Sequence, residues 1–571
     1  MKRRTRSNPG LPSHSRRSLL ASTLLTAPML ALGRGAQTHA DDTCKPRNAR
    51  EVIAETTYGK VRGFVTEDGA RTFRAIPYAA PPVGKNRFKP PMKPAPWTGV
   101  RDATQWGNRC PQVGSSISPE FALLIGNSYQ TPGEMDEDCL VLNIWTRGKR
   151  DGGKRPVMVR LHGGGFSTNS GNNKKYWGHN TVRRGDVVYV TMNHRLGALG
   201  FLDLSEIGGA DYAHSGNVGM LDLVACLEWI RDNIEEFGGD PNNVLIWGES
   251  GGGCKVCVLM AMPAAKGLFH RAVVESGPWL TVRTRAQAAE TADRFLARLG
   301  LSRPRLAELH TLPTLRLLEA QLMTTSRRWY PHERPISGGF SPVLDGSDIP
   351  SHPFEPTAPE VSADVPLIIG YNNDEGTFLL HHDPDLYALD EAGLAARVRD
   401  RAGEAWEEAI KVYREDYPGA TPTELICYLA RDLGFAMGSV AIAERKAALG
   451  KAPAYMYRLD WKSPAFGGLY GATHGLEDAF FMDNVTHQEV MTRNTPEAFA
   501  LAARTNALFI EFARTGVPSH PELPKWPHYD PATRAMMIFD NQSRIENDPA
   551  PRVREFWNRS KPGLNAGGRS G

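Results

Sequence analysis

The feature that most constrains this chain is the segment 244–253, where an apolar run leads into the pentapeptide Gly-Glu-Ser-Gly-Gly. Four apolar residues in a row, 244–247, predict a strand that is buried on both faces, and a helical sequence follows through Met260. Gly248 and Gly252 allow a sharp turn between the two, because they have no Cβ atoms to clash. Such a turn lifts the side chain of Ser250 out of the sheet, where its hydroxyl can meet a base.

The pentapeptide alone is a weak indication, because it arises by chance in a chain with 56 glycines. The strand before it and the helix after it are the context that this motif requires. We therefore interpret Ser250 as a candidate nucleophile on a strand-to-helix elbow, where the helix N-terminus favours negative charge.

The first 40 residues differ in composition from the rest of the chain. They carry seven Lys and Arg and no Asp or Glu, which leaves 60 basic and 63 acidic residues in the remainder. The overall charge of +4 therefore belongs to this segment and does not indicate a nucleic-acid or anionic-membrane partner.

The features of this segment follow one another in the order typical of a twin-arginine signal peptide. Arg16 and Arg17 precede a short apolar run through Leu32, and Thr38 and Ala40 supply a cleavage site. A disordered basic N-terminus is the alternative and explains this order less well. We expect residues 1–40 to direct export to the periplasm or beyond. The run is too short to span a bilayer, and no later stretch has about 18 uninterrupted apolar residues, so stable membrane insertion is not expected.

Several motifs together resemble the type B carboxylesterase and cholinesterase family. Residues 73–84 (FRAIPYAAPPVG) are similar to its N-terminal signature, and residues 137–144 (EDCLVLNI) are similar to a second one. Further matches follow in order at residues 162–166 (HGGGF), 193–197 (NHRLG), 237–241 (FGGDP) and the segment around Ser250. The resemblance covers nearly all of the mature chain.

The resemblance implies the α/β-hydrolase fold, a mostly parallel central sheet with helices on both faces. The residues themselves predict an antiparallel hairpin over 52–65. They predict further strands at 157–161, 187–192, 365–370 and 454–459. Residues 283–330 and 386–447 are typical of amphipathic helices, expected as inserts over an active-site gorge. We expect one catalytic domain over 41–561 and a flexible tail at 562–571.

Consecutive glycines follow the strand predicted at 157–161. Glycines let backbone N–H groups approach a substrate carbonyl and stabilise charge that develops on its oxygen. By motif match, Gly164 and Gly165 supply two donors of an oxyanion hole and Gly251 the third. A flexible turn is the alternative for this run taken alone. The family usually has alanine at position 251, so glycine there departs from its pattern.

A serine hydroxyl needs a base and a group that orients the base. The match to the family's N-x-D-E-G turn puts the acid at Glu375, although physical reasoning alone does not separate it from Asp374. The family's H-G-x-E loop matches at His474, the predicted base. The order serine, acid, histidine agrees with the α/β-hydrolase pattern.

The resemblance also implies supporting groups. Glu249, Ser276 and Glu477 match buried polar residues behind the triad. The pairs Arg87 with Glu137 and Arg195 with Asp222 match structural salt bridges. The implied chemistry needs neither a cofactor nor a metal.

Cysteine and aromatic residues complete the predictions. By resemblance, Cys110 and Cys139 form the family's first disulfide, which an oxidising compartment preserves. Trp279 either lines the acyl pocket or belongs to the core. Cholinesterases place a cation-binding tryptophan near the position of Tyr129, and tyrosine offers a weaker cation-π face, which disfavours choline esters.

We therefore expect an exported serine carboxylic-ester hydrolase that acts through an acyl-enzyme on small to medium apolar esters. The same triad could instead serve a carbamate or an amide. A non-catalytic binding protein on the same scaffold is the third hypothesis, against which the intact triad argues. The sequence makes no prediction of the oligomeric state.

Overall fold

The structure is a computed structural model that describes residues 49–114, 117–126, 130–325, 339–560 of the chain. These described residues belong to one compact unit. The predicted signal peptide (1–40), the predicted tail (562–571) and Tyr129 lie outside the described residues.

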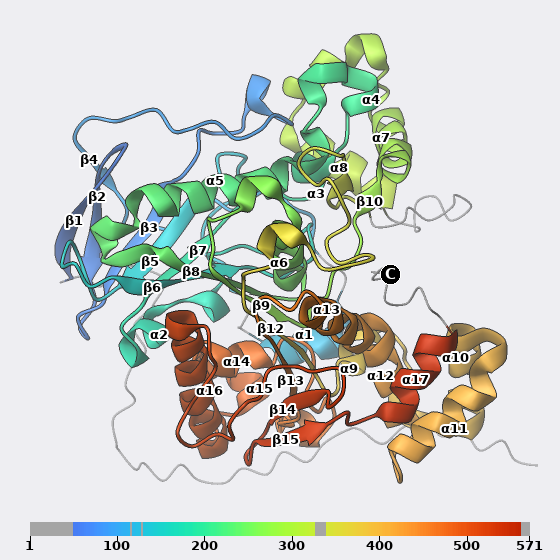
Figure 1. Ribbon diagram of the computed structural model, residues 1–571. Helices are drawn as coiled ribbons and strands as arrows, with labels where there is room; N and C mark the ends of the chain where they lie inside the picture. The colour runs from blue at the N-terminus through green and yellow to red at the C-terminus, as the bar shows by residue number, and fades with distance from the viewer. Residues whose placement is uncertain (1–48, 115–116, 127–129, 326–338, 561–571) are drawn as a thin grey trace, which may run out of the picture. The chain divides into compact units, whose positions relative to one another are not determined.

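A large mixed sheet forms the centre of the protein (Figure 1). Its strands run in the spatial order β1-β2-β3-β5-β7-β6-β8-β9-β12-β13-β14-β15, and β4 pairs with β2. Their bounds are β1 Arg50–Thr56, β2 Gly59–Val65, β3 Arg71–Pro77, β4 Val100–Asp102, β5 Val141–Thr146, β6 Arg155–Leu161, β7 Val188–Met192, β8 Gly239–Glu249, β9 Arg271–Glu275, β12 Leu367–Asn372, β13 Ala454–Leu459, β14 Ala535–Phe539 and β15 Arg544–Asn547. A separate pair consists of β10 (Arg283–Thr284) and β11 (Val343–Leu344).

The middle of the sheet is parallel and its edges are antiparallel. Strands β7, β6, β8, β9, β12, β13 and β14 pair in parallel. Strands β1, β2, β3 and β5 pair antiparallel at one edge, and β15 does so at the other. The predicted fold class is confirmed, as is the hairpin expected over 52–65, which β1 and β2 form.

Helices cover both faces of the sheet and also form the inserts (Figure 1). Their bounds are α1 Pro119–Ile125, α2 His179–Arg184, α3 Gly197–Phe201, α4 Ser205–Gly208, α5 Val218–Asn233, α6 Gly251–Ala261, α7 Arg285–Leu299, α8 Thr314–Thr325, α9 Gly376–Leu379, α10 Glu391–Ala402, α11 Trp406–Asp416, α12 Pro422–Arg431, α13 Met437–Ala448, α14 Glu477–Phe481, α15 Glu489–Thr492, α16 Pro496–Thr515 and α17 Pro551–Ser560.

Strand β8 shows why a continuous apolar run was needed. Val244 and Ile246 pack into the core cluster that also contains residues of α5 and α6. Leu245 and Trp247, which point the other way because side chains alternate along a strand, pack into the cluster with residues of α14 and α16. The strand that carries the candidate nucleophile is thus held from both faces.

The two helical inserts lie on the right side of the molecule in Figure 1, opposite the hairpin of β1 and β2. Their helices begin at local sequence signals. Thr284 caps α7 together with Gln287, and Thr421 caps α12 together with Glu424, each pair forming a reciprocal capping box. The described parts of the inserts predicted at 283–330 and 386–447 are therefore mainly helical, as expected.

One helix of the second insert changes its hydrogen-bond pattern. A π-helical turn, η12 (Asp432–Ala436), joins α12 to α13, and such turns often occur at functional sites. Within the described residues, the combined helix Pro422–Ala448 is the one long and apolar enough to cross a membrane, and 72% of its most apolar window is buried inside the protein. This burial is typical of a core helix.

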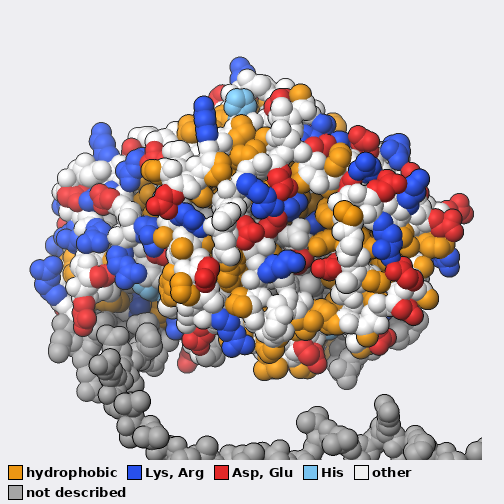
Figure 2. Space-filling view, turned by 90° about the horizontal axis from the view of Figure 1, so that it is seen from below, with side chains coloured by type: hydrophobic (Ala, Val, Ile, Leu, Met, Phe, Trp, Pro, Cys, Tyr) orange, Lys and Arg blue, Asp and Glu red, His pale blue; other side chains and the backbone are white. Residues whose placement is uncertain are grey.

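The charged side chains are mixed on the face shown in Figure 2. Lys and Arg are interspersed there with Asp and Glu. This distribution agrees with the near balance of 60 basic and 63 acidic residues after position 40.

Candidate active site

Ser250 occupies a tight turn between β8 and α6. Its backbone has φ 56° and ψ −124°, a strained conformation of the kind found at a nucleophile elbow. A Cβ atom on Gly248 would lie 2.4 Å from the backbone of Gly252, and one on Gly252 would lie 2.3 Å from the carbonyl oxygen of Leu161. Only glycines at these two positions allow the turn, as the sequence indicated.

The glycine loop after β6 contacts the first turn of α6. Gly164 (φ 83°) and Gly165 (φ 60°) have left-handed backbones that favour glycine. A Cβ atom on Gly251 would lie 2.3 Å from both the nitrogen and the oxygen of Gly165. The structure thus brings the predicted oxyanion-hole glycines together, and the contact depends on the absence of a side chain at position 251.

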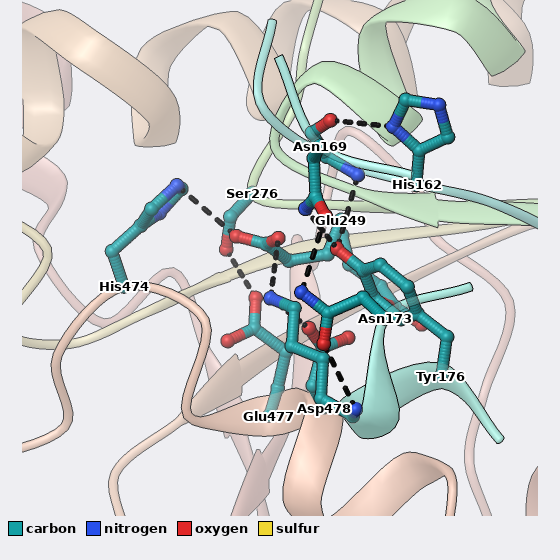
Figure 3. Close-up of polar contacts among 12 residues, drawn as sticks. His162, Asn169, Asn173, Tyr176, Glu249, Ser276, His474, Glu477 and Asp478 are labelled. Atoms are coloured by element: carbon teal, nitrogen blue, oxygen red, sulfur yellow. Dashed lines mark hydrogen bonds and ion pairs between the residues drawn. The ribbon is translucent and has the colours of Figure 1, made fainter. Parts of the chain in front are cut away.

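Two side chains hold this loop from behind (Figure 3). The hydroxyl of Tyr176 accepts a hydrogen bond from the Gly163 N–H (3.1 Å) and another from the amide of Asn169 (3.0 Å). The ammonium group of Lys255 donates to the carbonyl oxygen of His162 at 2.7 Å. Burial lowers the pKa of Lys255 to about 7. Neither Tyr176 nor Lys255 was singled out from the sequence.

Glu375 and His474 form the central hydrogen bond of the site. Nδ1 of His474 donates to Oε2 of Glu375 at 2.6 Å, and Oε1 of Glu375 accepts the Asn372 N–H at 2.9 Å. Asp374, the alternative that the sequence left open, instead accepts the N–H of Ala472 at 2.8 Å. The structure therefore brings Glu375, and not Asp374, to the imidazole.

Aromatic rings flank the imidazole of His474. Phe378, three residues after Glu375, stacks on it with centroids 4.5 Å apart, and Phe435 from the π-helical turn stacks on it at 5.0 Å. These rings restrict the orientation of the imidazole and help to bury it.

The second nitrogen of His474 faces another carboxylate. Nε2 lies 3.0 Å from Oε1 of Glu249 (Figure 3). In the part of the chain that the structure describes, no hydrogen bond joins His474 to the hydroxyl of Ser250. The imidazole of His474, the predicted base, thus lies between two carboxylates, those of Glu375 and Glu249.

This arrangement decides the charge of the imidazole. Burial is the largest influence and disfavours the charged form, but the carboxylates of Glu375 and Glu249 together outweigh it and raise the pKa of His474 to about 9. His474 is therefore an imidazolium at neutral pH, and both of its N–H groups have carboxylate acceptors.

The supporting residues predicted from the family pattern also lie together. Ser276 donates to Oε1 of Glu477 at 2.6 Å, and the side-chain amide of Asn372 donates to the other oxygen of Glu477. Burial, and after it the carboxylates of Glu249 and Glu375, raise the pKa of Glu477 well above its usual range. Both oxygens of Glu477 thus accept hydrogen bonds, in surroundings that disfavour its charged form.

A group of buried charges behind Glu249 was missed in the sequence. Its members are Arg160 on β6, Lys175 on the short helix η3 (Lys174–Tyr176), Glu275 on β9 and Asp478 on α14. Their side chains are 0–2% exposed. Charged residues within strands that are otherwise apolar, such as Arg160, are the signal that could have indicated them.

Trp279 lies beside the glycine loop. Its ring meets that of Phe166 edge to face at 5.6 Å, and Phe166 follows Gly165 directly. The indole N–H is buried without a partner among the described residues. Trp279 is half-buried and packs against the main core cluster.

The predicted disulfide is not present in the structure. Cys110 and Cys139 are both buried free thiols. A hydrogen bond from Cys110, and then burial, raise the pKa of the Cys139 thiol well above its usual range. The thiol groups of Cys110 and Cys139 are therefore neighbours.

The predicted structural ion pairs are present. Arg87 contacts Glu137 at 2.6 Å, and Arg195 contacts Asp222 at 2.6 Å. All four side chains are nearly inaccessible to solvent, so removal of either partner leaves a buried charge uncompensated.

Comparisons with known proteins agree with this geometry. The model of the carboxylesterase family matches residues 50–557. The para-nitrobenzyl esterase of Bacillus subtilis is 37% identical over 88% of this chain and 98% of its own length. The phenmedipham hydrolase of Pseudarthrobacter oxydans is 35% identical over 87% of this chain and 97% of its own length. The crystal structure of a carboxylesterase from Geobacillus stearothermophilus superposes with a TM-score of 0.76 at 36% identity, covering 88% of this chain and 99% of that chain.

The packing of Gly251 predicts that Gly251→Ala disturbs the glycine loop. Its new Cβ atom would lie 2.3 Å from the Gly165 backbone, so the loop must shift. We expect kcat for a p-nitrophenyl ester to fall by about tenfold or more, because oxyanion donors act only when well placed. Gly253→Ala is the matched control on α6, since its Cβ atom comes no closer than 3.0 Å to a neighbour. Equal activities of the two variants would contradict this role of Gly251.

The charge of His474 predicts an alkaline pH profile. Only the neutral imidazole can accept the proton of Ser250, and neutral imidazole becomes the major form as the pH rises through about 9. The value of kcat/KM should therefore rise by about tenfold per pH unit below pH 9 and level off above it. A profile that is already flat near pH 7 would show that His474 is neutral there.

Proposed function

Because the chain belongs to the carboxylesterase family, we propose that it hydrolyses small to medium apolar carboxylic esters through an acyl-enzyme on Ser250. The family match over residues 50–557 confirms the resemblance identified from the sequence motifs. Membership makes the protein a carboxylesterase, and the serine mechanism follows from the family. The substrate range, the roles of individual residues and the site of action are the parts that we propose.

The observation that carries the mechanism is the hydrogen bond of 2.6 Å between Glu375 and His474, close to the elbow that presents Ser250. A carboxylate on Nδ1 holds the imidazole in the tautomer whose Nε2 can accept a proton. It also stabilises the imidazolium that forms when the proton arrives.

The proposed reaction begins with the neutral imidazole. Nε2 of His474 takes the proton of Ser250 while its oxygen attacks the ester carbonyl. The N–H groups of Gly164, Gly165 and Gly251 hold the oxyanion. The imidazolium then protonates the leaving alcohol, and water hydrolyses the acyl-enzyme by the same route.

The contact between Nε2 and Glu249 fits this sequence of events. An imidazolium donates its Nε2–H to that carboxylate, whereas a neutral imidazole with its proton on Nδ1 has only a lone pair there. Two acceptors repel each other, so loss of the proton favours rotation of Nε2 away from Glu249. The hydroxyl of Ser250 is then the donor that the lone pair needs.

Apolar groups around the site support the proposed substrate range. Phe378 and Phe435 flank the imidazole, and Phe166 and Trp279 lie beside the glycine loop. Apolar walls with a few polar donors favour esters with hydrophobic acyl or alcohol groups. The similarity to a para-nitrobenzyl esterase is in keeping with this range.

A carbamate substrate is the second candidate, favoured by the 35% identity to a phenmedipham hydrolase. Carbamate carbonyls are less electrophilic than ester carbonyls, but the same triad can attack them. Kinetics on esters and carbamates that share an alcohol would separate the two candidates. The binding-protein hypothesis is disfavoured, because Ser250, Glu375 and His474 are all retained.

The proposed site of action is outside the cytoplasm. Arg16 and Arg17 precede an apolar run and a cleavage site, the order of a twin-arginine signal. An oxidising compartment would also favour a bond between the neighbouring thiols of Cys110 and Cys139.

Substitution of the nucleophile tests the mechanism. We expect Ser250→Ala to lower kcat for p-nitrophenyl butyrate by about 10⁴-fold or more, because no acyl-enzyme can form. The thermal unfolding midpoint should change little, since the side chain of Ser250 is only half-buried. Retained activity in a correctly folded variant would rule out Ser250 as the nucleophile. Repeating the assay on the wild-type enzyme with p-nitrophenyl esters of different acyl length would measure which acyl groups the pocket accepts.

Cell fractionation tests the export proposal. In a bacterium with a twin-arginine translocation system, the wild-type chain should leave the cytoplasm and begin near residue 41. The double variant Arg16→Lys, Arg17→Lys should remain in the cytoplasm at full length, because the paired arginines are the recognised feature. N-terminal sequencing and activity in each fraction measure both outcomes. A wild-type chain that stays cytoplasmic and uncleaved would refute the proposal.

A further inference from the structure

We propose that Lys175 is a positioning residue that acts through Glu249 to control when His474 is free to take the proton of Ser250. The inference rests on the proposed function, since it assigns His474 the role of general base. It concerns a buried cation that contacts no reacting atom and that neither the motifs nor the family pattern indicated.

The geometry places Glu249 between Lys175 and His474. Oε1 of Glu249 lies 3.0 Å from Nε2 of His474, and Oε2 lies 3.7 Å from the ammonium nitrogen of Lys175. The carboxylate therefore faces two cations, the imidazolium on one side and the ammonium on the other. Any change in one of these cations alters the charge balance felt by the other.

A second set of contacts fixes the position of Lys175. Its ammonium nitrogen lies 2.8 Å from Oδ2 of Asp478, whose other oxygen bonds to Arg160. Arg160 also contacts Glu275 at 2.6 Å. The chain of alternating charges thus runs from β9 through β6 and α14 to η3, and it ends at Glu249.

Every member of this chain is removed from water. The side chains of Arg160, Glu275 and Asp478 are 0% exposed, and that of Lys175 is 2% exposed. Because solvent screening is weak at such depth, each charge acts on its neighbours far more strongly than the exposed charges in Figure 2 act on theirs. Burial of so many charges is unfavourable unless each has a partner.

The charged and titratable groups that face Glu249 and His474 come from several elements. They are Arg160 on β6, Lys175 and Tyr176 on η3, Cys254 and Lys255 on α6, Glu275 on β9, Glu375 after β12, and Glu477 and Asp478 on α14. Burial raises the pKa of Glu249, whereas His474 and Lys175, in that order, oppose this rise and favour its charged form.

The sign of the effect follows from this arrangement. The charge of Lys175 offsets the negative potential of Glu249. It therefore reduces the stabilisation of the His474 imidazolium by Glu249. Without that charge, the imidazolium is the only cation that forms an ion pair with Glu249 among the described residues, and His474 releases its proton less readily. Lys175 therefore lowers the pH at which the base becomes available.

The test compares the pH profile of kcat/KM for p-nitrophenyl butyrate in the wild type and in Lys175→Met. The part of this profile that rises with pH is called the acidic limb. We expect the midpoint of the limb to move upward by ~1 pH unit in the variant, from the Coulomb energy of one charge at this range. The limiting value of kcat/KM at high pH should change by a smaller factor than its value at neutral pH. The pH dependence of Ser250 labelling by a fluorophosphonate should shift by the same amount, because it reports the same base.

Two matched variants separate charge from structure. Lys174→Met removes the neighbouring, half-buried lysine of η3 and should leave the limb in place. Lys175→Arg keeps the charge and should restore most of the wild-type limb. If Lys175→Met gives little folded enzyme, Lys175→Gln provides the same comparison, because its amide can still donate to Asp478.

A double-variant cycle tests the route through Glu249. In a Glu249→Gln background, Lys175→Met should shift the limb much less than in the wild type, because the carboxylate that connects them is gone. An equal shift in both backgrounds would overturn the proposed route.

A limb that stays in place, or moves to lower pH, while activity falls at every pH would assign Lys175 a purely structural role and overturn the inference. Failure of the proposed function would look different, since Ser250→Ala would then retain activity.

Discussion

The hydrogen bond between Glu375 and His474 joins parts of the chain that are 99 residues apart, and the remaining features of the site depend on it. Strand β12 delivers Glu375, and the loop after β13 delivers His474, because these strands are parallel neighbours whose ends meet at one edge of the sheet. The same edge receives Ser250 from β8. Three side chains that are distant in the sequence are therefore brought to one edge of the sheet.

The proposed general base, His474, is buried between two carboxylates, and this presents a conflict. In the proposed mechanism Glu375 orients the imidazole, but together with Glu249 it raises the pKa of His474 and makes its proton harder to remove. The surroundings reduce this conflict in two ways. Burial and the neighbouring carboxylates raise the pKa of Glu477, which disfavours a further negative charge, and Lys175 places a positive charge on the far side of Glu249. The network of charges behind the triad is thus an electrostatic part of the site as well as a packing element.

Much of the fold could be predicted from the sequence. The apolar run at 244–247 and the alternation over 52–65 are local patterns, and each forms the predicted strand, β8 and β2 with β1. The elbow glycines could be interpreted because a turn without Cβ clashes is also a local requirement. Glu375 and His474 were identified through motif resemblance, and physical reasoning alone did not separate Glu375 from Asp374. Their hydrogen-bond partners, which distinguish them, lie about 100 residues away.

The sequence by itself determined where the elbow, the glycine loop and several of the strands occur, because backbone geometry and burial pattern act over a few neighbouring residues. Only the tertiary structure decided that Nε2 of His474 faces Glu249, that Gly251 packs on Gly165, and that Lys175 lies beside Asp478. Charges interact through space, and in a buried site their strength depends on distance and the exclusion of water. The distance between two charges and the exclusion of water around them cannot be deduced from the order of residues along the chain.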